Sequence, residues 1–325
     1  MKKLGVFLAV VLGLCAFAAC GGNDNNTSDG GSSSSSASLS TGSNGSSSSS
    51  SSGGGAPEGM VYIAPGTFMM GSPTSEAGRF TNEDQHQVTL MKSFYMGKYL
   101  VTQELYQSVT GVNPSYNQGE SRLPAEGEEQ AKRPVENVTW FDAVEFCNKL
   151  SENEGLQPMY TFISRMPATG YPITNAQVAI LDWGKSGYRL PTDAEWEYAC
   201  RAGTTTAWCM GDTEVGPPHI NVYAWYSSNA GGKTHEVGKK AANAWGLYDM
   251  HGNVYEWCWD WYSSSLGTNP VTDPVGPGPS TQWRKVYRNG STPSNYSTLR
   301  SAFRFYRNPV ERSQLLGFRV VRLAP

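Results

Sequence analysis

The sequence predicts an α+β fold with a large share of irregular structure. Two segments have the apolar spacing and the capping residues of helices, whereas the stretches that resemble strands are short. Glycine and proline punctuate most of the remaining chain, with 36 Gly and 19 Pro in 325 residues. The 12% of aromatic residues, ten Trp among them, can supply the buried area that a loop-rich core requires.

The two predicted helices begin at good N-terminal caps. The first spans residues 139–151, with Thr139 as its N-cap. The second spans residues 192–203, where Thr192 and Glu195 form the pattern of a capping box. A side-chain oxygen at the cap satisfies a backbone N–H that the helix leaves free, so both starts are specified locally.

The other predicted elements have weaker signals. A third helix is expected to begin near Thr102. Short runs of β-branched and aromatic residues predict strands at 60–63, 88–90, 94–96, 286–288 and 318–321. The segments between them are expected to be coil whose backbone groups are hydrogen-bonded to side chains.

The N-terminus predicts export and lipid attachment. Residues 1–19 have the basic start and the apolar run of a signal peptide, too short to span a bilayer stably. The small residues before Cys20 resemble a bacterial lipobox, which implies cleavage there and a diacylglycerol on the Cys20 thiol. Residues 20–56 are rich in Ser and Gly and predict a flexible tether. We therefore expect a lipoprotein anchored to a bacterial membrane, at the outer membrane and the cell surface.

Residues 57–325 are expected to form one domain, because no second linker or internal repeat interrupts them. The net charge is −3 and charges of both signs are interspersed, so the sequence gives no indication of nucleic-acid binding. The domain's cysteines have neither C-x-x-C nor zinc spacing, which leaves both disulfides and buried free thiols open; they are Cys147, Cys200, Cys209 and Cys258.

The C-terminal segment, about residues 283–320, has the composition of a binding surface. Arg and Gly recur through it, and the positions between them hold aromatic and small polar residues, as in antibody loops. The alternative is an irregular surface coil that arginines hold in place and that binds no ligand. The candidate ligand-binding residues are Trp283, Tyr287, Asn289, Thr292, Pro293, Ser294, Tyr296, Ser297, Phe303, Phe305 and Tyr306.

Five ordered motifs of the domain resemble the formylglycine-generating enzyme (sulfatase-modifying factor) superfamily. The resemblance covers residues 57–325 and implies a C-type-lectin-like fold of the formylglycine-generating-enzyme type. The motifs are the segments 59–72, 134–147, 187–199, 243–257 and 317–320.

The same resemblance argues against catalysis. The enzymes use two cysteines, five residues apart, that bind copper as thiolates. When Arg288-Asn-Gly-Ser291 is aligned with the family's Arg-Gly-Gly-Ser, those positions fall on Ser294 and Leu299. A related branch uses iron held by a histidine motif, H-x-x-x-H-x-E, which this chain lacks. We therefore expect no enzymatic activity and no required cofactor.

The family resemblance also implies a structural calcium site. Carried over to this chain, Asp249 and Glu256 would provide side-chain oxygens, while Gly252 and Val254 would provide backbone carbonyls. Hard oxygen ligands on an irregular loop suit Ca²⁺. The alternative is that the two carboxylates only cap nearby backbone amides.

One branch of the superfamily lacks the catalytic cysteines and varies its C-terminal segment. The chain resembles this branch, the variable proteins of diversity-generating retroelements, and in particular the lipid-anchored variable proteins of Treponema. Mutagenesis directed to template adenines rewrites AAY-type codons there, and all candidate residues except Trp283 belong to the reachable set. Glu311 and Gln314, which lie in the same segment but are not candidates, do not belong to it.

The resemblance implies display of a diversified site for a protein or glycan ligand on another cell or on a host surface. We also expect the chain to be a monomer. Two alternatives stay open. One is a non-enzymatic lipoprotein of the same fold with a single fixed partner, and the other is an enzyme of unrecognised chemistry.

Overall fold

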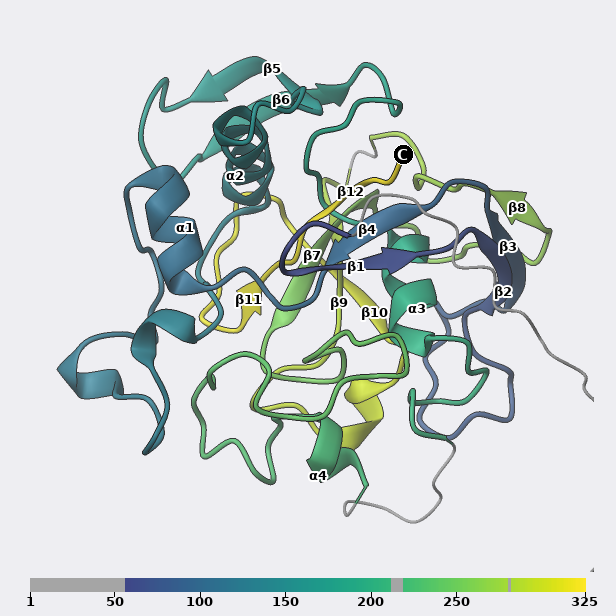
Figure 1. Ribbon diagram of the computed structural model, residues 1–325. Helices are drawn as coiled ribbons and strands as arrows, with labels where there is room; N and C mark the ends of the chain where they lie inside the picture. The colour runs from purple at the N-terminus through teal and green to yellow at the C-terminus, as the bar shows by residue number, and fades with distance from the viewer. Residues whose placement is uncertain (1–55, 212–218, 280–281) are drawn as a thin grey trace, which may run out of the picture. The chain divides into compact units, whose positions relative to one another are not determined.

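The computed structural model describes residues 56–211, 219–279 and 282–325 (Figure 1). The predicted signal peptide, Cys20 and the tether up to residue 55 lie outside these residues. Within the described ranges, no helix is both long and apolar enough to cross a membrane. The mixture of short helices and strands confirms the predicted α+β class.

The two capped helices form as predicted. Thr139 caps the first and Thr192 the second. In each helix the carboxylate at the third helical position accepts a hydrogen bond from the backbone N–H of the cap residue. The weaker helix also forms, with Thr102 as its N-cap. The helices of the described residues are α1 (Gln103–Thr110), α2 (Trp140–Asn153), α3 (Asp193–Arg201) and α4 (Ile220–Tyr223), with 3-10 helices η1 (Glu120–Arg122), η2 (Gln130–Lys132) and η3 (Tyr296–Leu299).

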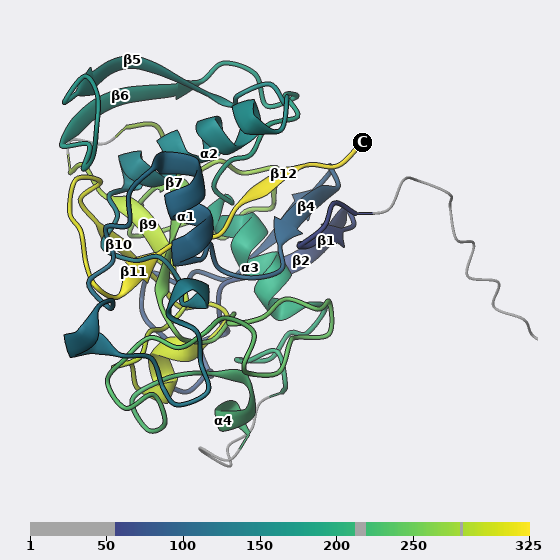
Figure 2. The same ribbon diagram turned by 60° about the vertical axis from the view of Figure 1, so that its left-hand side comes forward.

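The strands of the described residues form four small sheets. One has the order β1 (Met60–Ile63), β4 (Phe94–Gly97), β12 (Val321–Leu323). A second has the order β2 (Gly66–Met70), β3 (His86–Leu90), β8 (Val271–Thr272). The hairpin β5 (Tyr160–Met166) and β6 (Asn175–Ile180) lies beside α2 (Figures 1 and 2).

The fourth sheet carries most of the C-terminal segment. Its order is β10 (Arg304–Arg307), β9 (Lys285–Arg288), β7 (Tyr255–Trp261), β11 (Leu316–Gly317), and only the β7–β11 pair is parallel. Helix α3 lies next to this sheet in both views (Figures 1 and 2). Side chains from β7 and β9 enter both of the large apolar clusters, one around α2 and the other around α3.

The strand predicted at residues 318–321 begins too early, because only Val321 lies in a strand, β12. Residues 318–320 connect β11 to β12 and cross from one sheet to another. Their backbone stays bonded, since the Phe318 carbonyl accepts from Val101 and the Val320 carbonyl accepts from Gly97. Sequence patterning could not separate such a bonded connection from a strand, because both place apolar residues in the core.

The four cysteines of the described residues are free thiols. Cys147, Cys200 and Cys258 are buried, and Cys209 is half-buried. Of the two possibilities left open by the sequence, free thiols are therefore the one observed in this part of the chain.

Candidate functional site

Four arginines of the C-terminal segment are buried and bind carboxylates from distant parts of the chain. We call them the arginine frame. Arg288, on β9, contacts Asp193 and lies 2.9 Å from a carboxylate oxygen of Glu197, both on α3. Burial opposes the charge of Arg288, but these two carboxylates outweigh it and raise the pKa of the guanidinium. The frame consists of Arg288, Arg300, Arg304 and Arg319, all at most 2% exposed.

The remaining frame arginines fix three further points of the segment. Arg300 binds both oxygens of Glu83, at 2.7 and 2.8 Å. Arg304 approaches Asp193 within 2.8 Å, so this carboxylate joins β9 to β10 through two guanidinium groups. Paired and hydrogen-bonded charges of this kind specify the backbone position, because either partner left alone would be a buried, uncompensated charge.

Arg319 completes the frame by holding β7. Its guanidinium binds both carboxylate oxygens of Glu256, at 2.6 and 2.9 Å, and donates to the carbonyl of Tyr248. Arg307, by contrast, is about one-third exposed and lies 3.6 Å from Glu311 on the surface. Arg307 is therefore not part of the frame, although it belongs to the same segment.

A row of aromatic side chains crosses the same sheet. The register pairs Trp257 with Tyr287, and Tyr287 with Phe305, on β7, β9 and β10. Exposure increases along this row from 0% to 8% to 38%. The row therefore begins in the core and ends at the surface with Phe305.

Phe305 belongs to a continuous set of ring contacts at the edge of the sheet. Its ring is 4.7 Å from that of Tyr306, and Tyr306 is 4.4 Å from Tyr262. On the other side, Phe305 lies 6.5 Å from Phe303, which meets the exposed ring of Phe80 at 5.6 Å. We call the accessible members of this set, Phe80, Tyr262, Phe305 and Tyr306, the aromatic patch.

Phe80 and Tyr262 were not among the predicted site residues. They lie outside the C-terminal segment in sequence, Phe80 in the loop after β2 and Tyr262 just beyond β7. Nothing in their local pattern distinguishes them from other surface aromatics. Only the tertiary contacts with Phe303 and Tyr306 reveal that they extend the patch.

The other accessible candidates lie in separate contacts. Tyr296 is 55% exposed and faces Trp208, with 6.5 Å between ring centroids. Trp283 is exposed and lies 6.4 Å from Trp261. Pro293 is exposed and Ser297 is half-buried. The structure thus joins Phe305 and Tyr306 in one patch, and it places Tyr296 and Trp283 in contacts of their own.

Five predicted ligand-binding residues are buried, and the expectation that their side chains are exposed is wrong. Tyr287 and Phe303 pack in the core around α2, and Ser294 accepts a hydrogen bond from the backbone N–H of Ser291. A buried side chain offers a ligand almost no contact area, so these residues belong to the scaffold. They are Tyr287, Asn289, Thr292, Ser294 and Phe303.

The two positions that correspond to the copper-binding cysteines are also buried. Ser294 shares a hydrogen bond of 2.9 Å with the Tyr255 hydroxyl, and Leu299 packs with residues of α4. Leu299 also fills the space beside Gly290, where an added Cβ would lie 2.1 Å from its side chain. Cys200 lies 3.6 Å from Ser301, but burial raises the pKa of its thiol to about 12. A protonated buried thiol is a poor copper ligand.

The four residues expected to bind calcium come together around one side chain. Asp249, Gly252, Val254 and Glu256 are all buried, and each directs one oxygen at the amide nitrogen of Asn289. The prediction that they bind Ca²⁺ stays untested by these contacts. Among the described side chains, no group of three or more His, Cys, Asp or Glu is arranged to hold a metal ion.

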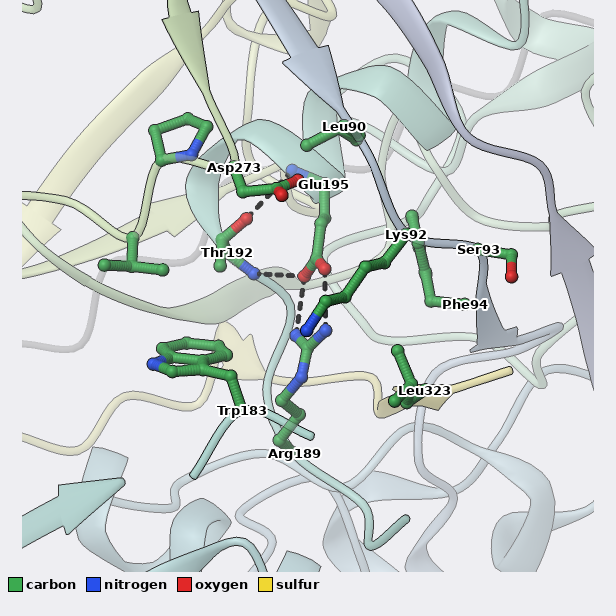
Figure 3. A pocket seen from close by; sticks show the side chains of 12 residues that line it. Leu90, Lys92, Ser93, Phe94, Trp183, Arg189, Thr192, Glu195, Asp273 and Leu323 are labelled. Atoms are coloured by element: carbon green, nitrogen blue, oxygen red, sulfur yellow. Dashed lines mark hydrogen bonds and ion pairs between the residues drawn. The ribbon is translucent and has the colours of Figure 1, made fainter. Parts of the chain in front are cut away.

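A cavity of about 350 Å³ lies elsewhere, between the β3–β4 turn, the N-terminus of α3 and the loop after β8. At its base the Arg189 guanidinium points to the Glu195 carboxylate, with both nitrogen–oxygen distances at 2.6 Å (Figure 3). Glu195 also accepts from the backbone of Thr192, so it completes the cap of α3. None of the predicted ligand-binding residues lines this cavity.

Solved structures and curated sequences resemble the chain over most of its length. Treponema denticola variable protein 1 superposes with a TM-score of 0.73 at 39% identity, covering 82% of this chain and 95% of that one. Chaperone protein LppX of Paenibacillus barcinonensis is 36% identical over 71% of this chain and 81% of its own length. The formylglycine-generating enzyme of Thermomonospora curvata is 29% identical over 81% of this chain and 92% of its own length.

These similarities confirm the predicted fold type, since a solved structure superposes over 82% of the chain and the family model matches almost all of the domain. They also confirm the resemblance to the variable proteins of Treponema. The model of the sulfatase-modifying factor enzyme 1-like domain matches residues 47–324. The chain therefore belongs to the sulfatase-modifying factor enzyme 1-like (FGE-sulfatase) family.

Proposed function

We propose that the chain is a non-enzymatic binding protein whose C-terminal segment carries a diversified site for a protein or glycan ligand. One observation carries the proposal. Accessible aromatic side chains, Phe305 and Tyr306 among them, stand on strands whose backbone is fixed by buried arginine–carboxylate pairs. Such a surface can change its side chains while the strands beneath keep their position.

The chemistry of the aromatic patch suits a macromolecular ligand. Aromatic rings give large contact areas at a small cost in side-chain entropy, and Tyr, Trp and Arg are enriched where interfaces gain most of their energy. Arg284 adds a cation 4.1 Å above the ring of Tyr306. The patch therefore combines apolar area with polar groups at its rim, which favours a protein or glycan surface over a small ion.

Diversification is tested most directly on the gene. We expect a near-copy of codons 283–320 beside a reverse-transcriptase gene, with differences confined to adenines of the template. The codons for the accessible residues Tyr296, Phe305 and Tyr306 should fall at those differences. A locus without such a copy would contradict the diversification and leave binding to a fixed partner.

The absence of catalysis is part of the proposal. Ser294 and Leu299 provide no thiolate, and the thiol of Cys200 is protonated at neutral pH because burial raises its pKa to about 12. We expect that the copper-loaded protein, mixed with oxygen and a cysteine-containing sulfatase peptide, forms no aldehyde. Aldehyde formation above that of free copper would establish an enzyme instead.

Surface display rests on the N-terminal sequence, and it has a separate test. We expect the wild-type protein to label with a radioactive fatty acid and to sediment with membranes. Cys20→Ser should abolish the label and release the protein into the soluble fraction. Cys15→Ser, a change in the same apolar run, should leave both properties intact.

A fixed partner is the second candidate function. The relative at 36% identity is named a chaperone protein, and a chaperone that served one constant client would need the same binding surface in every strain. The two functions differ in what related strains would contain. A diversified site predicts strain-to-strain changes concentrated at Tyr296, Phe305 and Tyr306, whereas a fixed partner predicts the same residues at these positions.

A further inference from the structure

Four oxygens converge on the side-chain amide nitrogen of Asn289. Three are backbone carbonyls and one belongs to a carboxylate. The distances from Nδ2 are 2.8 Å to the Asp249 carbonyl, 2.8 Å to the Gly252 carbonyl, 3.0 Å to the Val254 carbonyl and 3.3 Å to Oε1 of Glu256. An amide group has only two protons to donate, so it cannot make four full hydrogen bonds. The arrangement is that of a cation cage with a partly positive NH₂ group at its centre.

The cage uses the residues that the family resemblance assigns to calcium, although not all of the expected atoms. The side chain of Asp249 turns away, and its Oδ2 accepts from the backbone N–H of Gly238 at 2.8 Å. Only the backbone carbonyl of Asp249 faces Asn289. The position expected to contribute a charged ligand therefore contributes a neutral one.

The charge of the cage is also balanced without a metal. Glu256 is its one charged member, and Arg319 binds both oxygens of that carboxylate at 2.6 and 2.9 Å. A divalent cation would find no net negative charge in this group. Calcium takes oxygen ligands at about 2.3–2.6 Å. A calcium ion held by the same four oxygens would occupy the space of the Asn289 nitrogen, so the two cannot be present together.

Asn289 is held firmly in this position. Its backbone φ is 69°, a left-handed conformation that Asn adopts more readily than most residues. Its side-chain oxygen accepts from the backbone N–H of Gly290 at 2.7 Å, and the residue is 1% exposed. When the Arg288–Ser291 segment is aligned with the family's Arg-Gly-Gly-Ser, Asn289 stands where the family has glycine.

We propose that the Asn289 carboxamide takes the place of the family's structural calcium. It ties the 249–256 loop to the end of β9 by side-chain hydrogen bonds, so the chain folds and keeps its stability without the metal. Asn289, predicted from sequence to contact ligand, is in this assignment a residue of the scaffold.

The test compares calcium binding and thermal unfolding of the full-length wild type and of Asn289→Gly. Glycine accepts the positive φ without strain and removes the amide from the cage. We expect no calcium binding to the wild type by titration calorimetry and the same unfolding midpoint in chelator and in calcium. Asn289→Gly should unfold several degrees lower in chelator. Calcium at about 100 times its Kd should raise that midpoint by several degrees.

Asn137→Gly is the matched control. Asn137 has a φ of 65°, and its amide donates to a single carbonyl, that of Pro114, at 2.9 Å. This variant has the same entropic cost of a new glycine, but it leaves the four oxygens around Asn289 and the Asn289 amide unchanged. Its unfolding midpoint should fall in the same way with and without calcium.

The outcomes decide the proposal even where the glycine variant folds poorly. Asn289→Asp, which puts a carboxylate among the four oxygens, should be strongly destabilised in chelator and recover in calcium. Stoichiometric calcium binding to the wild type, with a rise in its midpoint, would overturn the proposal. So would an Asn289→Gly protein that folds in chelator and ignores calcium, since the cage would then have no capacity for the metal.

Discussion

Strands β9 and β10 each carry an arginine next to an aromatic residue, and the two kinds of side chain differ in environment. The arginines are Arg288 and Arg304, and the aromatic residues are Tyr287 and Phe305. The register aligns Arg304 with Arg288 and Phe305 with Tyr287. Both arginines are buried and share the carboxylate of Asp193, whereas the row of aromatic rings ends at the surface in Phe305. Side chains alternate between the faces of a strand, so one face of this pair of strands carries the ion pairs. The other face packs in the core at Tyr287 and reaches the surface only at Phe305.

The comparison teaches how one short segment can serve two purposes. Its stability depends on residues whose charges are satisfied only by partners far away in the chain, such as Asp193 for Arg288. Its surface depends on rings that contact mainly one another. Substitutions of the buried scaffold residues and of the surface rings must then differ in their cost to folding by several kcal/mol.

The largest expected effect is that of Arg288→Met. The substitution leaves the carboxylates of Asp193 and Glu197 buried with part of their compensation gone, which costs about 3–5 kcal/mol of unfolding free energy. Urea denaturation followed by circular dichroism measures this loss. Arg284→Met is the control, because Arg284 is half-buried, covers the ring of Tyr306 and donates to the exposed side chain of Gln282, so no buried carboxylate loses its partner. Equal losses in the two variants would break the comparison.

The second expected effect separates two phenylalanines that are two residues apart. Phe303 is 5% exposed and packs in the core around α2, so Phe303→Ala should cost about 3 kcal/mol. Phe305 is 38% exposed, and Phe305→Ala should cost less than about 1 kcal/mol. Parallel melting curves of the two variants provide the measurement. A larger loss for Phe305 would place the patch inside the core.

These two phenylalanines also show what sequence alone could not predict. Both belong to one segment of mixed composition, and both have small or aromatic neighbours, so neither composition nor alternation distinguishes them. Phe303 is the ring that meets Phe80 and the core. Its contact with Phe80 joins residues more than 200 positions apart in the sequence, so no local pattern reveals it. The β5–β6 hairpin was missed for a related reason, since its strands have no clean alternation of buried and exposed residues.

Local signals, by contrast, were sufficient for the helices. Thr139 and Thr192 specify their starts through bonds within one turn, and such bonds can be read from residues three apart. The arginine frame could not be predicted from such local signals, because the carboxylates that it binds lie far away in the sequence. The contacts of Asn289 could not be predicted either. A residue in a changeable stretch of sequence gives no indication that four oxygens from another loop surround it.

An intermediate effect is expected at Ser294, one of the two positions that correspond to the copper-binding cysteines. Its hydroxyl accepts from the backbone N–H of Ser291 at 2.9 Å and shares a bond of 2.9 Å with Tyr255. Ser294→Ala leaves both groups without this partner, at a cost of about 1 kcal/mol. Chemical denaturation of Ser294→Ala beside Ser297→Ala, a change at a half-buried hydroxyl, measures the difference. No loss at Ser294 would mean that the turn from 291 to 294 tolerates variation.

The smallest expected effect on folding is that of Tyr296→Ala. Tyr296 is 55% exposed and contacts Trp208 only at 6.5 Å between centroids, so the unfolding free energy should change by no more than about 0.5 kcal/mol. Leu299, three residues later in the same η3 helix, is 1% exposed, and Leu299→Ala should cost about 2–5 kcal/mol. Denaturation curves for this pair test the comparison outside the sheet. A tolerant Tyr296 beside an intolerant Leu299 would extend the division into scaffold and changeable surface to the whole segment, whereas equal sensitivity would confine it to β9 and β10.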